Sequence, residues 1–201
     1  MRDDTHGGAG AERAPALQER KERIRKSAKE LFSRFGFKKT TVDEIAEDAG
    51  ISKRTLYGVF GSKEKILADL VMTEALSFRK RLMGQMKAII DPVEKLRLLC
   101  DASRRYFDEN PFLGQVLADD AGLYAPFLGN EIHRIEEGMQ GIIASILADG
   151  IREGVFREMD VPATAWCIMM LYRDFTYQRT PAVDGNTAWV PFILNAIAAK
   201  E

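Results

Sequence analysis

The feature that most limits how this chain can fold is the close spacing of helix start and stop signals within one short segment. Thr41 is followed three residues later by Glu44, a capping-box pattern that starts a helix. Gly50 ends this helix, because glycine has the backbone freedom that a sharp turn requires. Ser52 then caps a second helix, which ends at Gly61. The segment therefore predicts two short helices joined by a tight turn.

Helical signals of the same kind continue along the chain. An apolar stripe with helical spacing runs from Ile24 to Phe35, and Pro92 and Pro162 stand where further helices begin. We find no convincing alternation of apolar and polar residues of the kind that marks a half-buried strand. The sequence therefore predicts an all-α fold of about nine helices. The predicted helices cover residues 16–35, 41–49, 52–60, 62–82, 92–107, a short segment from 111, 125–153, 162–177 and 186–199.

Charge is divided unevenly along the chain, although the net charge is only −1. Residues 20–65 carry a net charge of +6, residues 66–201 carry −5, and residues 1–19 carry −2. A basic module joined to an acidic body indicates that one end of the chain meets a polyanion. The Gly-rich start, residues 1–15, has no periodicity and is expected to be a disordered tail.

Cysteine use and hydropathy indicate the compartment. Cys100 and Cys167 lie far apart inside apolar segments, which favours two buried thiols in a reducing cytosol over a disulfide or redox pair. No apolar run approaches the roughly 18 residues that span a bilayer. The N-terminus also lacks the apolar region of a secretory signal. The predicted location is the cytoplasm.

The two short helices present one apolar face and one polar face. Ala46 and Ala49 are small, so that the following helix can approach closely. In a helix-turn-helix arrangement, side chains at the start of the second helix face base edges in the major groove. Arg suits guanine, while Lys, Ser and Tyr can contact bases or phosphates. The outward residues at this position are Ser52, Lys53, Arg54, Thr55 and Tyr57.

The stretch from Ile24 to Leu67 resembles the DNA-binding signature of the TetR family of transcriptional regulators. The matching residues are Ala28, Leu31, Phe32, Gly36, Phe37, Thr40, Thr41, Val42, Ile45, Ala46, Ala49, Gly50, Ile51, Ser52, Thr55, Leu56, Tyr57, Phe60, Ser62, Lys63, Glu64 and Leu67. Two positions depart from the pattern. Val59 stands where the family usually has His or Tyr, and Gly58 weakens a short helix by roughly 1 kcal/mol relative to Ala.

The resemblance implies a regulator, most simply a repressor, that binds a palindromic operator in double-stranded DNA as a homodimer and is released by a small, mostly apolar effector. It divides the chain into a tail (1–15), a helix-turn-helix DNA-binding domain (16–65) and a ligand-binding and dimerisation domain (66–201). By position, Thr41, Ser52, Thr55, Tyr57 and Lys63 resemble the family's DNA contacts. Lys53 and Arg54 are added because they are basic and face solvent beside the turn.

The last two predicted helices have broad apolar faces for helices at a chain end. In TetR-like proteins the equivalent helices form a four-helix bundle between subunits, and the alternative is that these side chains close the core of one subunit. The candidate interface residues are Trp166, Met169, Met170, Tyr177, Trp189, Phe192, Ile193 and Ile197.

The resemblance also implies a ligand cavity under the helix that follows the DNA-binding domain. Met suits irregular cavities, Gly138 and Gly141 leave space, and Ser103 and Tyr106 can act as polar anchors. The alternative is ordinary core packing. The candidate lining residues are Phe78, Leu82, Met86, Leu99, Ser103, Tyr106, Phe107, Leu117, Tyr124, Phe127, Met139, Ile143 and Met169.

Two other classes of protein compete with the regulator. An enzyme is disfavoured because the chain has no phosphate-binding loop, catalytic motif or Cys/His cluster, so neither a cofactor nor a metal is expected. An architectural or protein-regulated DNA-binding factor stays open. A small molecule that changes DNA affinity would favour the regulator.

Overall fold

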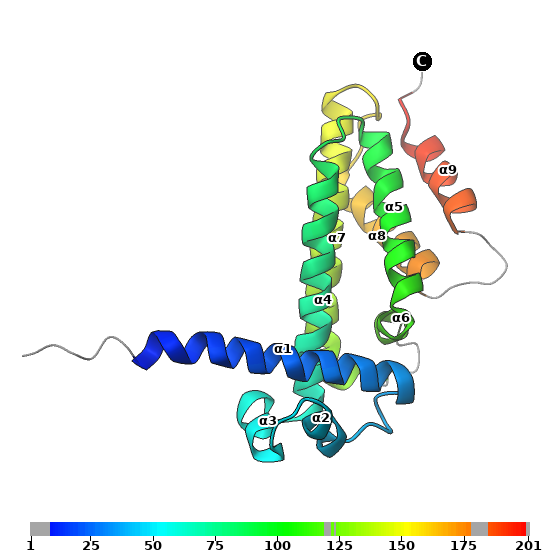
Figure 1. Ribbon diagram of the computed structural model, residues 1–201. Coiled ribbons are helices and arrows are strands. Elements are labelled where there is room, and N and C mark those ends of the chain that lie inside the picture. Colours follow the sequence, from blue (N-terminus) through cyan, green and yellow to red (C-terminus); the bar gives the residue numbers. More distant parts are fainter. Residues whose placement is uncertain (1–8, 119–121, 123, 178–184, 200–201) are drawn as a thin grey trace, which may run out of the picture. The chain divides into compact units, whose positions relative to one another are not determined.

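The computed structural model describes residues 9–118, 122, 124–177 and 185–199 (Figure 1). In these ranges the chain forms nine helices and no strand, with one isolated bridge between Phe156 and Ala198. The all-α prediction is confirmed. The helices are α1 (Ala9–Phe35), α2 (Val42–Asp48), α3 (Lys53–Phe60), α4 (Lys63–Met86), α5 (Pro92–Glu109), α6 (Pro111–Ala118), α7 (Ala125–Arg152), α8 (Val161–Tyr177) and α9 (Gly185–Ile197).

Backbone contacts divide the chain into two compact units, residues 1–70 and 71–201. The first unit contains α1, α2, α3 and the beginning of α4. The second contains the remainder of α4 and the helices that follow it, so α4 supplies residues to both units. None of the described helices combines the length and the apolarity of a membrane-spanning segment.

The start of α2 and the turn after it have the predicted geometry. The Thr41 hydroxyl accepts a hydrogen bond from the backbone N–H of Glu44, and the Glu44 carboxylate accepts one from the backbone N–H of Thr41. Gly50 has a φ of 64°, in the left-handed region that favours glycine. The Ser52 hydroxyl then accepts a hydrogen bond from the backbone N–H of Thr55 and caps α3. Local capping therefore fixes where both short helices begin.

The core of the first unit is formed by apolar side chains from each of its helices. Ile24, Ala28 and Phe32 on one stripe of α1 are fully buried, as are Ile45 of α2 and Leu56 of α3. Removing these side chains from water is the main force that holds the short helices together.

One expectation for α1 is wrong, and one residue of its apolar stripe is exposed. The helix begins at Ala9, before the predicted start near Ala16, because the segment preceding Pro15 is rich in good helix formers. Phe35 belongs to the apolar stripe but is 47% exposed, since it is the last residue of the helix. The guanidinium of Arg34 lies 4.9 Å from the centre of its ring.

A buried ion pair ties α1 to α4 within the first unit. Arg25 is 8% exposed, and its Nε donates to the Asp69 carboxylate at 2.5 Å. Its Nη1 donates to Glu22 at 2.8 Å. Burial alone would lower the pKa of Arg25, but the hydrogen bonds and charges of Asp69 and Glu22 raise the pKa. This arginine of the basic segment 20–65 therefore has internal carboxylate partners.

The second unit is a bundle in which α7 packs against α5 and α8, while α8 also packs against α6 and α9 (Figure 1). A buried hydrogen-bond chain connects α8 to α5: Tyr172 donates to Ser103 at 2.7 Å, and Ser103 donates to the carbonyl of Leu99 at 2.6 Å. The two cysteines are both free, but only Cys100 is buried. The expectation of two buried thiols is wrong for Cys167, which is exposed beside Trp166 on α8.

Candidate functional site

The N-terminal half of α3 presents hydroxyl and basic side chains to solvent. Ser52, Lys53, Arg54 and Tyr57 are exposed, with Tyr57 exposed by 44%. Thr55 is half-buried, and its hydroxyl lies 2.8 Å from that of Ser52. The buried Leu56 and Phe60 occupy the opposite face of α3. The first turns of the helix therefore form a polar surface on a rigidly packed support.

Lys53 is paired with an acidic residue that the sequence did not single out. Its ammonium lies 2.7 Å from the Asp43 carboxylate, across the turn between α2 and α3. The hydrogen bond to Asp43 raises the pKa of Lys53. Both side chains are exposed, so a phosphate oxygen could replace the carboxylate at little cost. No pattern in the sequence links two residues this far apart on separate helices.

The two remaining candidate DNA contacts also take part in local structure. Besides its capping role, Thr41 donates its hydroxyl hydrogen to the Glu44 carboxylate at 2.8 Å. The Lys63 ammonium donates to the carbonyl oxygens of Phe37 and Thr40, at 2.8 Å each, and lies 4.4 Å from the centre of the Phe37 ring. Lys63 is half-buried, at the first residue of α4. The candidate DNA contacts thus all lie in the first unit, on or next to α2, α3 and the start of α4.

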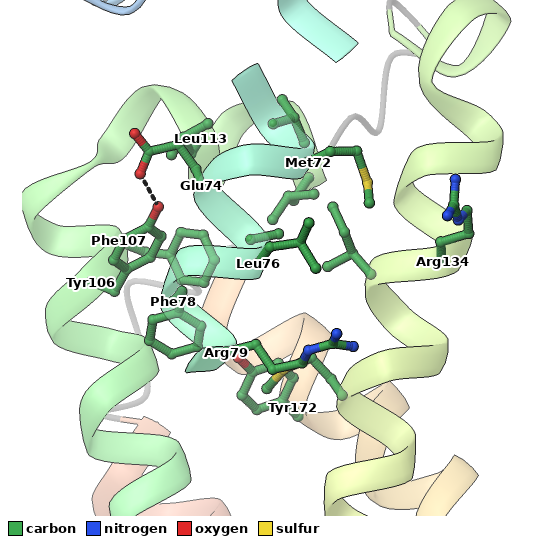
Figure 2. Close-up of a pocket in the computed structure, with 15 residues that line it drawn as sticks. Met72, Glu74, Leu76, Phe78, Arg79, Tyr106, Phe107, Leu113, Arg134 and Tyr172 are labelled. Atoms are coloured by element: carbon green, nitrogen blue, oxygen red, sulfur yellow. Dashed lines mark hydrogen bonds between the residues drawn. The ribbon is translucent and has the colours of Figure 1, made fainter. Parts of the chain in front are cut away.

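The second unit contains a cavity between α4, α5, α6, α7 and α8 (Figure 2). It measures about 50 Å³, and the empty space reaches about 590 Å³ when the part open to solvent is included. The wall is mostly aliphatic and aromatic. The residues that line it are Val71, Met72, Glu74, Ala75, Leu76, Phe78, Arg79, Tyr106, Phe107, Leu113, Leu117, Arg134, Ile135, Met139 and Tyr172.

The structure brings five of the candidate pocket residues together in this wall, namely Phe78, Tyr106, Phe107, Leu117 and Met139. The other candidates lie elsewhere. Met86 lines a neighbouring groove and Leu99 a separate small space near α9. Outside this wall are also Leu82, Ser103, Tyr124, Phe127, Ile143 and Met169, most of them buried among core side chains. Apolar periodicity identifies an inward face, but it does not distinguish a filled core from a cavity.

Polar groups stand at opposite sides of the cavity. Tyr106 donates its hydroxyl hydrogen to the Glu74 carboxylate at 2.8 Å, and burial together with this hydrogen bond raises the pKa of Tyr106. In the view of Figure 2, Arg79 and Arg134 lie on the side away from this pair. Glu74, Arg79 and Arg134 were missed from the sequence, because charged residues on amphipathic helices are expected to face solvent.

An open groove of about 570 Å³ adjoins the cavity wall at Arg79, which lines both spaces. Met83 and Met86 of α4 form one side of this groove. Gly138 and Gly141 of α7 form part of the other side. A Cβ added at Gly141 would meet no atom within 4 Å, whereas one at Gly138 would lie 2.8 Å from Nη1 of Arg79.

The candidate dimer residues divide into two groups. On α8 and α9, Trp166 is 55% and Phe192 is 65% exposed, which is unusual for side chains of this size. Met170 is half-buried. Met169, Ile193 and Ile197 are buried within the single chain. The side chains of Tyr177 and Trp189 lie outside the described residues.

Among the residues with described positions, no group of three or more His, Cys, Asp and Glu side chains could hold a metal ion. The two candidate functional sites are therefore the polar face of α3 and the cavity with charged residues at its edge.

Two short helices joined at Gly50, with hydroxyl and basic side chains on the second, define a helix-turn-helix protein. The model of a family described as bacterial regulatory proteins, tetR family, matches residues 24–70. The chain is 26% identical over 186 residues to the HTH-type transcriptional regulator YhgD of Bacillus subtilis, covering 84% of this chain and 90% of that protein. It is 28% identical to the transcriptional regulator RutR of Escherichia coli, covering 87% and 83% of the two chains. The chain therefore carries the DNA-binding domain of the TetR family of transcriptional regulators.

Solved structures share the fold over most of the chain. A TetR transcription regulator from Haloarcula marismortui superimposes with a TM-score of 0.75 at 18% identity, covering 90% of this chain and 99% of that one. The regulator FadR from Bacillus subtilis, solved in complex with stearoyl-CoA, gives a TM-score of 0.72 at 24% identity, covering 87% and 95%. At sequence identities this low, the TM-scores show a common fold alone.

Proposed function

We propose that a homodimer of this protein binds a near-palindromic operator through two copies of α3 and represses transcription until a small, mostly apolar effector releases it. One observation carries the proposal. The helix α4 begins in the unit that contains α3, and its later residues line the cavity of the second unit. A ligand in the cavity therefore contacts a helix whose first turns belong to the DNA-binding unit.

The DNA side of the proposal depends on the exposed side chains of α3. A single module offers too few base contacts for useful discrimination, whereas two modules related by twofold symmetry read two half-sites about 34 Å apart. Arg54 can donate two hydrogen bonds to a guanine, and Tyr57 can contact a base or a phosphate. Lys53 gains a phosphate partner on binding, in place of its exposed pair with Asp43.

The effector side depends on the size of the cavity. A space of about 50 Å³ holds a few water molecules but no drug-sized ligand, so an effector must displace wall residues as it enters. The wall includes residues of α4 from Val71 to Arg79, so that ligand entry and movement of this helix are coupled. A ligand that binds the DNA-free form better must lower operator affinity by the same factor.

Selection from a random DNA library tests the DNA side. We expect enrichment of a near-palindrome by the wild-type protein. The variants Arg54→Ala and Tyr57→Ala should lose roughly 1–3 kcal/mol of specific binding while they keep weak, salt-dependent binding to any DNA. The matched control is Arg97→Ala, a change of an exposed arginine in the second unit. A library without palindromic enrichment would contradict the proposal.

A thermal-shift screen of apolar metabolites, antibiotics and acyl thioesters, followed by operator release with any hit, tests the effector side. Release of the operator by a compound that stabilises the protein supports the proposal. If compounds bind without changing operator affinity, an architectural or protein-regulated DNA-binding factor becomes the better account.

A further inference from the structure

The cavity wall carries an imbalance of charge that bears on the effector. Twelve of its side chains are apolar or aromatic, and the remaining three are Glu74, Arg79 and Arg134. Two cations and one anion therefore border a small apolar space, and Arg79 and Arg134 are both exposed to solvent.

The negative group already has an internal partner. The Glu74 carboxylate accepts the hydrogen bond of Tyr106 at 2.8 Å, and the Arg81 guanidinium lies 5.6 Å from the centre of the Tyr106 ring. On this side of the cavity, side chains of α4 and α5 already contact one another. The Glu74 carboxylate is therefore a poor binding site for a cationic ligand.

The two positive groups, Arg79 and Arg134, lack an internal partner of this kind in the part of the chain that the structure describes. Neither Arg79 nor Arg134 has an ion-pair partner among the described residues, whereas Arg25 and Arg152 are each held by a carboxylate at 2.5 Å. Figure 2 shows both guanidiniums on the side of the cavity away from the Glu74–Tyr106 pair. They come from different helices, α4 and α7, so a ligand that contacts both would link the two helices.

We propose that the effector is an amphipathic anion, with its apolar part in the cavity and its anionic head against Arg79 and Arg134. A guanidinium offers planar, paired donors that match a carboxylate or a phosphate. This inference rests on the proposed function, because it assigns a chemical class to the effector of the same cavity.

The groove beside Arg79 gives the anionic head room outside the cavity. Lys87 and Lys95 also line it, and the acidic residue there, Asp149, is already paired with Arg152 at 2.5 Å and with Lys95 at 3.5 Å. The groove therefore keeps a positive balance of charge, and a head group larger than a carboxylate can extend into it.

The test uses three probes that share one apolar chain and differ in the head group: octanoate, 1-octanol and octylamine. Binding to the full-length protein is measured by calorimetry at neutral pH. We expect octanoate to bind about tenfold more tightly than octanol, because two exposed ion pairs contribute a few-fold each. Octylamine should bind most weakly, and added salt should reduce only the preference for octanoate.

Single substitutions test whether Arg79 and Arg134 cause the preference for octanoate. Arg79→Gln and Arg134→Gln should each lower the affinity for octanoate several-fold and leave that for octanol unchanged. Lys80→Gln removes the same charge from an exposed residue of α4 outside the cavity wall, and it should change neither affinity.

Three outcomes would overturn the inference: octylamine binding most tightly, equal affinity for the three probes, or no binding of any of them. Binding of the selected operator by the ligand-free protein is measured on the same preparation. Its failure would instead contradict the proposed function.

Discussion

At the scale of the residue, Lys63 shows how one basic side chain can support the fold and remain available to DNA. Two hydrogen bonds to backbone carbonyls hold its ammonium against the loop between α1 and α2, beside the ring of Phe37. An ammonium group has three donors, so one is left for a phosphate oxygen. We therefore expect its removal to affect both stability and DNA binding.

Replacing Lys63 by Met should lower the free energy of unfolding by about 1–2 kcal/mol, because two carbonyl oxygens lose charged hydrogen-bond donors. The measurement is urea unfolding followed by circular dichroism. The control is Lys65→Met, which removes the same charge from an exposed residue two positions further along α4. Equal stability of the two variants would show that the Lys63 contacts contribute nothing to the fold.

Glu44 is the residue for which a pH dependence is expected. The backbone hydrogen bond from Thr41 and then the one from its side chain lower the pKa of Glu44 below 4.5. A lowered pKa contributes stability that is present above the unfolded-state value and is lost as the pH falls through the folded-state value. The Glu44→Gln variant should therefore lose less stability than the wild type on acidification below about pH 4.5. Parallel acid-unfolding curves of the two proteins would contradict this role.

At the scale of the element, the sequence predicts helix starts well where a side chain caps the backbone. Thr41 and Ser52 each cap the helix that they were expected to start, and Asp91 caps the helix expected to begin at Pro92. The predicted start of α1 was wrong. The Gly-rich composition of residues 1–15 favoured a disordered tail, although good helix formers stand directly before Pro15. Caps are local, so the sequence contains all that is needed to recognise them.

The cavity was less predictable, because it depends on how side chains from five helices meet. Phe78 and Met139 line it, but Leu82 and Ile143, on the same two helices, are packed in the core. The charged side chains at its edge could not be inferred, since an arginine on an amphipathic helix is normally assigned to solvent. Helical periodicity thus predicts which residues face inward but not where packing is incomplete.

Gly58 gives a test of α3 as an element. It lies in the exposed part of the helix, and a Cβ added there would meet no atom within 4 Å. Gly58→Ala should therefore stabilise the first unit by roughly 0.5–1 kcal/mol. Gly50→Ala is the matched control, because its φ of 64° should make that change destabilising by about 1–2 kcal/mol. If Gly58→Ala also destabilised the protein in thermal unfolding, the backbone of α3 would differ from the one described.

At the scale of the whole molecule, the account requires two copies of the chain. The exposed Trp166 and Phe192 lie on α8 and α9, the helices that were expected to form the interface. Burying such large apolar side chains against a second copy is favourable by about 1.5–3 kcal/mol for each.

The double variant Trp166→Glu/Phe192→Glu should therefore shift the protein from dimer to monomer in sedimentation experiments, because it would place charges in an apolar interface. The control is Ile90→Glu, at an exposed apolar residue outside α8 and α9. A double variant that stays dimeric would place the interface on another surface.

The most direct test of the central claim, a twofold dimer that reads two half-sites through α3, is a change in half-site spacing. Five base pairs inserted between the half-sites of the selected operator rotate one of them by about half a helical turn. Affinity for this DNA is measured beside that for the original operator. We predict that it falls to about the level of an operator with a single half-site. Equal affinity for both DNAs would contradict the account, because it would show that the two half-sites are not read by one symmetric dimer.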